Sequence, residues 1–239
     1  MVAGDRHAVE VVPAVEISTI DAEHADLHIL GYRVDHRHHG LLDALERARA
    51  AREQRAERIV AALRDAGLEL DERLLEARRS AGASIGRPHL AQAAIAHPAN
   101  AERLRAEGAT DVNAFIEAYL IPGRPGFRPR DAPSVAQAIE LVHAAGGVAV
   151  WAHPFWDVDG VTAFDAAIAR FAALGVDGVE AFYVTHTREQ TLHAAAAALG
   201  HGLLTTGSSD FHGPQHRLFS RFGAFELHGL HAELGPIDR

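Results

Sequence analysis

Helical patterns alternate with short apolar segments in the second half of the chain, and this alternation limits the fold more than any other feature. Each of three helical segments is followed by an apolar run with the composition of a strand: 134–145 by 148–152, 162–173 by 176–183, and 187–198 by 203–207. This order is typical of a parallel sheet or barrel that is covered by helices. The sequence therefore predicts an α/β fold.

The first 40 residues predict two further strands. Residues 8–18 are rich in valine, and residues 26–34 form a second apolar segment. Side chains on a strand alternate between its two faces, so we expect His28 and Tyr32 to lie on the same face. Glu16 lies near the end of the first of these strands.

The middle of the chain is helical and has little strand character. Helical periodicity covers about 41–63, 71–79, 88–96, 101–107 and 111–119. We interpret this block as an insertion into the α/β fold. The expected organisation is a first barrel part at 1–42, a helical insertion subdomain at 43–133 and a second barrel part at 134–239.

The amino-acid composition limits which catalytic groups and metal ligands this chain can use. The 239 residues include 17 histidines and no cysteine, and because the chain has no lysine, all 23 basic residues are arginine. The lack of cysteine excludes disulfides, zinc ribbons and thiolate nucleophiles. The lack of lysine excludes Schiff-base chemistry and a P-loop. Histidines and carboxylates remain, and both are ligands of divalent metals.

Charge and hydropathy exclude other classes of partner. The formal net charge of −9 argues against stable binding to duplex nucleic acid. No apolar run reaches the roughly 18 residues that a membrane span needs, and the first residues lack the apolar core of a signal peptide. We expect a cytoplasmic protein with no membrane partner.

Polar side chains follow three of the predicted strands. Glu16 closes the first strand, His153 follows the strand at 148–152, and Asp210 and His212 follow the strand at 203–207. Loops after the strands of parallel α/β folds converge on one face and build the active site there. These residues therefore predict a divalent metal site. Glu180, late in another strand, is a weaker candidate for the same face.

Five segments in order resemble the PHP (polymerase and histidinol phosphatase) superfamily, most closely its stand-alone TrpH-type phosphoesterases. They are VEIS, LHILGY, GRPH, GGVAVWAHP and GSSDFHG. The resemblance implies a distorted (β/α)7 TIM-like barrel with a helical insert. It also implies metal-dependent hydrolysis of phosphate monoesters or diesters of nucleotides or short oligonucleotides by a metal-activated water.

The resemblance also implies roles for individual residues. The metal ligands would be Glu16, His28, His153, Asp210 and His212. Arg87 and His89, in the GRPH segment, would bind the substrate phosphate and take part in catalysis, and the planar guanidinium suits a phosphate. The ions would be divalent, with Mn²⁺, Zn²⁺, Fe²⁺ and Mg²⁺ all left open.

The chain departs from the family pattern at its beginning. The family's HxH motif and Asp-His pair are missing, so the expected barrel is N-terminally incomplete, from a misassigned start, a truncated gene or degeneration. We expect the five remaining ligands to bind metal weakly and the chain to have little phosphoesterase activity. We also expect an exposed parallel strand edge that favours self-association.

Two other classes of function stay open. The first is a catalytically impaired PHP-like fragment or a non-catalytic binding module. The second is a related metal hydrolase such as an amidohydrolase, which the absence of lysine disfavours. Single residues have plainer interpretations as well: Arg87 and His89 could cap a helix that starts near Pro88, and His186 is expected at a surface or helix position.

Overall fold

The computed structural model describes residues 10–21, 23–24 and 27–238. These residues form two compact units. Unit 1 comprises the described residues up to Leu42 together with those from Ala132 onward, and unit 2 spans Asp43–Asp131. Within the described part of the chain, no helix combines the length and the apolar character that crossing a bilayer requires.

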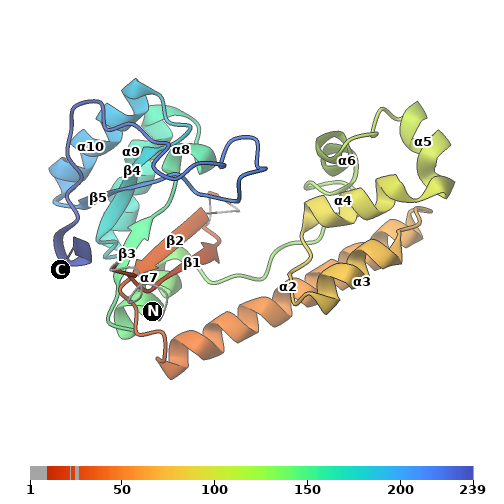
Figure 1. Cartoon of the computed structure of the whole chain (residues 1–239), viewed down its shortest axis with the longest axis horizontal. Helices are drawn as coiled ribbons and strands as arrows, with labels where there is room; N and C mark the ends of the chain where they lie inside the picture. Colours follow the sequence, from red (N-terminus) through yellow and green to blue (C-terminus); the bar gives the residue numbers. More distant parts are fainter. Residues whose placement is uncertain (1–9, 22, 25–26, 239) are drawn as a thin grey trace. The chain divides into compact units, whose positions relative to one another are not determined.

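Unit 1 is built on a five-stranded mixed sheet (Figure 1). In spatial order the strands are β1 (Ala14–Thr19), β2 (Leu27–Tyr32), β3 (Val148–Trp151), β4 (Gly178–Tyr183) and β5 (Leu204–Ser208). Strand β2 is antiparallel to both β1 and β3, whereas β3, β4 and β5 are parallel. The α/β class is therefore confirmed, and the parallel pairing applies to the second half of the chain.

The first two strands differ from expectation in length and direction. Strand β1 starts only at Ala14, directly after Pro13, which cannot donate to a strand ladder. Residues 8 and 9 of the expected strand lie outside the described residues. Strands β1 and β2 follow each other without a helical crossover, so they pair antiparallel. The edge strand β1 is thus antiparallel to its neighbour, and the expected parallel edge is wrong for this side of the described sheet.

Helices cover one face of the sheet. These are α7 (Val135–Ala144), α9 (Gly160–Ala173) and α10 (Arg188–His201). Trp151 of β3 is fully buried and packs against Phe164 and Phe171 of α9, with ring centroids 5.4 and 4.9 Å apart. Gly31 of β2 lies so close to α7 that a Cβ there would come within 2.8 Å of Val142.

The register leaves polar side chains on the opposite face. Glu16 lies across from Leu30, and Ser18 lies across from His28. Exposure alternates along β2, with Leu27 and Ile29 fully buried and His28 only half-buried. The two-residue period therefore places Glu16 and His28 on one face of the β1–β2 pair, as the sequence predicts for His28.

Unit 2 is helical. Its elements are α2 (His39–Asp65, which begins in unit 1), α3 (Glu72–Ser80), α4 (Arg87–Ala96), η1 (Pro98–Asn100), α5 (Ala101–Ala106) and α6 (Val112–Tyr119). Leu63, Leu75, Leu90 and Phe115 are at most 1% exposed and form the centre of its own core. A separate core of this kind lets the unit hold its shape independently of the sheet.

The chain returns to the sheet at its C-terminal end. After β5 it runs without long elements to η2 (Gly235–Asp238). The Thr205 backbone N–H donates to the Glu233 carbonyl, and the Glu233 N–H donates to the Thr205 side chain. These bonds fasten the segment that carries Asp210 and His212 at both of its ends, because β5 precedes it and Glu233 follows it.

Candidate metal centre

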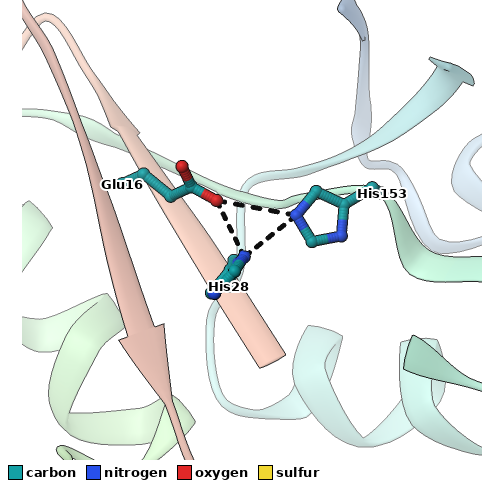
Figure 2. Close-up of side chains that lie close together, drawn as sticks. All are labelled: Glu16, His28 and His153. Atoms are coloured by element: carbon teal, nitrogen blue, oxygen red, sulfur yellow. Dashed lines mark hydrogen bonds and ion pairs between the residues drawn. The ribbon is translucent and has the colours of Figure 1, made fainter. Parts of the chain in front are cut away.

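Three side chains from separate elements converge above the polar face of the sheet (Figure 2). Oε1 of Glu16 lies 2.8 Å from Nδ1 of His28 and 3.5 Å from Nε2 of His153. The two histidine nitrogens lie 3.0 Å apart. Three ligand atoms of the right type thus surround one point, although the residues are up to 137 positions apart in the sequence.

The spacing of these atoms fits a shared ion. Donors about 2.0–2.1 Å from a tetrahedral zinc ion lie about 3.3 Å from each other, close to the spread of the three distances here. Nδ1 of His28 faces both of the other donor atoms at once, which a single ring proton cannot satisfy. The donor set, one carboxylate and two imidazoles, is typical of zinc, manganese and iron sites.

Backbone geometry holds His153 in place. It follows β3 directly and has a φ of 27°, outside the usual range for a residue with a side chain. Its N–H donates to Oε2 of Glu180 at 2.8 Å, and Pro154 starts α8 (Pro154–Asp157) immediately after it. Strain of this kind is stored where a side chain must be aimed.

The electrostatics favour a charged carboxylate at the centre. Hydrogen bonds with His153 and His28 hold the pKa of Glu16 well below its usual range. Burial alone would lower the pKa of His153, but Asp157 and Glu16 offset this and raise it to about 10. Burial raises the pKa of Glu180 to about 7. The ionised carboxylate of Glu16 therefore faces both imidazoles, an arrangement that suits a bound cation.

Asp210 is linked to His153 indirectly, through the side chain of Tyr183. The Tyr183 hydroxyl donates to Oδ2 of Asp210 at 2.8 Å, and the Tyr183 ring lies 5.5 Å from the His153 ring. Asp210 also has a positive φ, 45°. Nδ1 of His212 lies 2.6 Å from the backbone oxygen of Asp210, and the His212 ring lies 5.3 Å from the Phe219 ring. Asp210 and His212 thus follow β5 as expected, but neither belongs to the three-residue group.

Arg87 and His89 lie in unit 2, at the start of α4. Nδ1 of His89 accepts a hydrogen bond from the Gly86 N–H at 3.0 Å, so it caps this helix. Burial lowers the pKa of His89, which keeps the ring neutral and able to accept. The plainer interpretation of His89 as a capping residue thus describes what it does here, and contact with a substrate stays a prediction.

Two residues near the centre, Asp157 and Tyr183, were missed by the sequence analysis. Oδ2 of Asp157 lies 3.4 Å from Nδ1 of His153, whereas Glu16 faces the other ring nitrogen, Nε2. Tyr183 joins His153 to Asp210. The carboxylate four residues after His153, in a helix begun by Pro154, was a usable signal for Asp157, because residues i and i+4 of a helix meet. Nothing in the local sequence pointed to Tyr183.

His186 is more enclosed than expected. Its ring contacts Phe155 and Tyr183, at centroid distances of 5.1 and 5.4 Å, and its Nδ1 lies 3.1 Å from the Ala181 carbonyl. Burial lowers its pKa to about 4. The expectation of a surface or helix position is therefore wrong, because the loop after β4 folds the ring back against the aromatic side chains.

Known proteins give this geometry its context. A comparison with models of protein families finds no match. The chain is 31% identical to the 5'-3' exoribonuclease Rnm of Escherichia coli K12, over 87% of this chain and 67% of that protein. It is 30% identical to the 3',5'-nucleoside bisphosphate phosphatase of Chromobacterium violaceum, over 89% and 71%. It is also 30% identical to an Eggerthella lenta phosphoribosyl 1,2-cyclic phosphate 1,2-diphosphodiesterase, over 88% and 76%.

Two solved structures share the fold of this chain. A structure from Chromobacterium violaceum, described as an amidohydrolase, superposes with a TM-score of 0.73 at 27% identity, covering 99% of this chain and 76% of that one. A protein from Bifidobacterium adolescentis, described as a metal-dependent phosphoesterase, gives 0.69 at 26% identity, over 93% and 74%. Fold and site thus define a metal-dependent hydrolase of the α/β class. The chain belongs to the PHP-type phosphoesterase family.

Proposed function

We propose that this chain hydrolyses phosphate monoesters or diesters of nucleotides or short oligonucleotides, using water activated by divalent metal. The observation that carries the proposal is the convergence of Glu16, His28 and His153, in a chain whose relatives are named as a phosphatase, a diphosphodiesterase and exoribonucleases. The three donors, one carboxylate and two imidazoles, suit a divalent ion.

The residues around the centre have separate tasks in this proposal. Glu16, His28 and His153 hold an ion. When bound, a divalent cation lowers the pKa of a coordinated water and neutralises phosphate oxygens. Asp157 orients the His153 ring by facing its other nitrogen. Burial raises the pKa of Tyr183 above its usual range, so the hydroxyl stays protonated and holds the Asp210 carboxylate toward the site.

Asp210 and His212 are proposed as further ligands, and Arg87 and His89 as residues that bind the phosphate and assist catalysis. Support for Asp210 comes from its link through Tyr183 to His153. Support for the other three comes from the family resemblance of their segments. Among the four metals left open, the two imidazoles favour Mn²⁺, Zn²⁺ or Fe²⁺ over Mg²⁺, which prefers oxygen.

The finer placement of the chain is also proposed. It comprises the TrpH type, a distorted (β/α)7 barrel, a helical insertion subdomain at 43–133 and a cytoplasmic location. Self-association through the edge strand β1 remains part of the proposal, since an edge strand offers unpaired backbone groups whatever its direction.

A second candidate function is a metal-binding module with impaired catalysis. It is favoured by the number of donors: among the described residues, three meet at the centre, which suffices for one ion. Hydrolysis by paired ions would require more ligands than this group supplies.

Metal binding and hydrolysis, measured on the same samples, test both candidates. We expect Mn²⁺ or Zn²⁺ to bind in titration calorimetry and to support release of phosphate from adenosine 3',5'-bisphosphate. His153→Ala should abolish both, whereas His201→Ala, which removes an exposed imidazole from the last turn of α10, should change neither. Binding without hydrolysis would select the impaired module, and hydrolysis that survives in His153→Ala would refute the metal centre.

A further inference from the structure

One large aromatic side chain near the metal centre is left facing solvent. Trp156, in α8, is 57% exposed and lies three residues after His153. The other tryptophan, Trp151, is fully buried. Leaving an indole in water forgoes the free energy that its burial would contribute, and within the described part of the chain more than half of this side chain stays uncovered.

Ring contacts connect Trp156 to the centre. The His153 ring lies 5.5 Å from Tyr183, Tyr183 lies 6.0 Å from Phe219, and Phe219 lies 5.9 Å from Trp156. The backbone N–H of Trp156 also donates to the His153 carbonyl at 2.9 Å. The contacts thus form a closed loop that starts and ends at His153. An exposed indole is in this way fixed beside the residue that would hold the ion.

The Phe219 ring, which contacts Trp156, is itself held in place by several interactions. Its side chain is buried, and its ring stacks on His216 at 5.0 Å with an interplanar angle of 17°. The Phe219 N–H donates to Nδ1 of His216, and its carbonyl accepts from the His212 N–H. Trp156 therefore contacts a ring that hydrogen bonds to the backbone hold in place, while more than half of its own surface stays accessible.

We propose that Trp156 is the stacking surface for the base of a nucleotide whose phosphate lies at the metal centre. This inference rests on the proposed function and names the part of the substrate that the metal centre does not hold. Every nucleobase has a flat π-face, so stacking on an indole accepts all bases and needs no specific hydrogen bonds. Phosphate and base are joined through a single ribose, which requires a base site close to the ligands, as Trp156 is.

Another exposed aromatic pair lies near Asp210 but fits this role less well. Phe211 and Phe222 stack on each other at 4.1 Å with an interplanar angle of 28°. Their facing surfaces are therefore already in contact with each other. Trp156 is tilted by 59° against Phe219, so the Phe219 ring does not stack on a face of the indole.

Tryptophan fluorescence measures the contact directly. Since Trp151 is fully buried, quenching by an added solute reports on Trp156. We expect adenosine 3',5'-bisphosphate with Mn²⁺ to quench the emission saturably, on excitation at the red edge of the indole band, and ribose 5-phosphate with Mn²⁺ to leave it unchanged. Equal quenching by the two compounds, or by neither, would overturn the proposal.

Variants at Trp156 distinguish stacking on an aromatic ring from contact with any large apolar side chain. We expect Trp156→Leu to raise the KM for the bisphosphate about 5- to 150-fold, the range that stacking on one base implies, with little change for ribose 5-phosphate. Trp156→Phe keeps a ring and should restore most of the affinity. Leu199→Ala, which removes another exposed apolar side chain, on α10, is the matched control and should behave as wild type.

The outcomes distinguish the two proposals. If Trp156→Leu and Trp156→Phe hydrolyse the bisphosphate with the same KM in the presence of metal, the stacking surface is refuted and the proposed phosphoesterase activity is not. Saturable quenching by the bisphosphate but not by ribose 5-phosphate, unchanged in Leu199→Ala and accompanied by no hydrolysis, would support the stacking surface and refute the proposed activity.

Discussion

The enclosed histidine of unit 1 should make this unit sensitive to acid. The pKa of His186 falls from its ordinary value of 6.5 to about 4 because burial disfavours the charged ring. The folded protein therefore holds the ring neutral where the unfolded chain would protonate it. The stabilising contribution is complete above about pH 6.5 and is lost as the pH falls from there toward about 4.

The size of this loss follows from the two pKa values. One pKa unit corresponds to about 1.4 kcal/mol, so the full contribution is about 3 kcal/mol. Between about pH 7.5 and about pH 4.5, linkage gives a loss of about 2.5 kcal/mol in the free energy of unfolding, because protonation of the folded form has begun to offset it at the lower pH. Other groups titrate in this window as well, so the contribution of His186 has to be isolated by a variant.

His186→Asn provides that comparison. An asparagine amide can replace the ring nitrogen Nδ1 as a donor to the Ala181 carbonyl, but it does not titrate. Urea unfolding followed by tryptophan fluorescence reports on unit 1, which contains both Trp151 and Trp156. We expect wild type to lose about 2.5 kcal/mol more than His186→Asn over the window, with His201→Asn matching wild type. Parallel pH profiles for wild type and His186→Asn would refute the burial argument.

Two further predictions follow from contacts of β3 and the residues after it. Asp157→Asn should weaken Zn²⁺ or Mn²⁺ binding about 10- to 100-fold in calorimetry, because it removes the charge that orients the His153 ring. An unchanged affinity would show that Asp157 has no part in the centre. Trp151→Ala should lower the free energy of unfolding by about 3–5 kcal/mol in urea melts, since it empties a fully buried site between Phe164 and Phe171. A loss below about 1 kcal/mol would mean that the site collapses around the smaller side chain.

The elements of unit 1 could be predicted from local patterns, but their pairing could not. Ser134 and Thr187 each form a capping box with the glutamine three residues on, so the starts of α7 and α10 were visible in the sequence. Strand direction depends on partners that lie far apart in the chain. Val148–Trp151 pairs with Leu27–Tyr32 across the whole of unit 2, and no local pattern reports that contact.

The candidate site likewise has a part that the sequence predicts and a part that it does not. Residue types and positions after strands indicated Glu16 and His153, and the family resemblance added His28; the structure brings these three within contact distance of each other. Asp210 and His212 were indicated by the same argument but lie outside this three-residue group. What the sequence could not supply was the layer around the three-residue group. Tyr183 ends a fully buried strand, where an aromatic residue is normally read as core.

The antiparallel pairing of β1 and β2 explains why this centre can form from so few elements. In an antiparallel pair, residues on one face lie opposite each other at close range, and the register puts Glu16 two residues away from the partner of His28. A parallel arrangement would place a helical crossover between the two strands. Here the hairpin supplies two of the three donors, and β3, which is antiparallel to β2, delivers His153 beside them from its C-terminal end. The β1–β2 hairpin thus places Glu16 and His28 on one sheet face through its register, whereas His153 is placed at the C-terminal end of β3. The candidate metal centre lies where the side chains from these two sources come together.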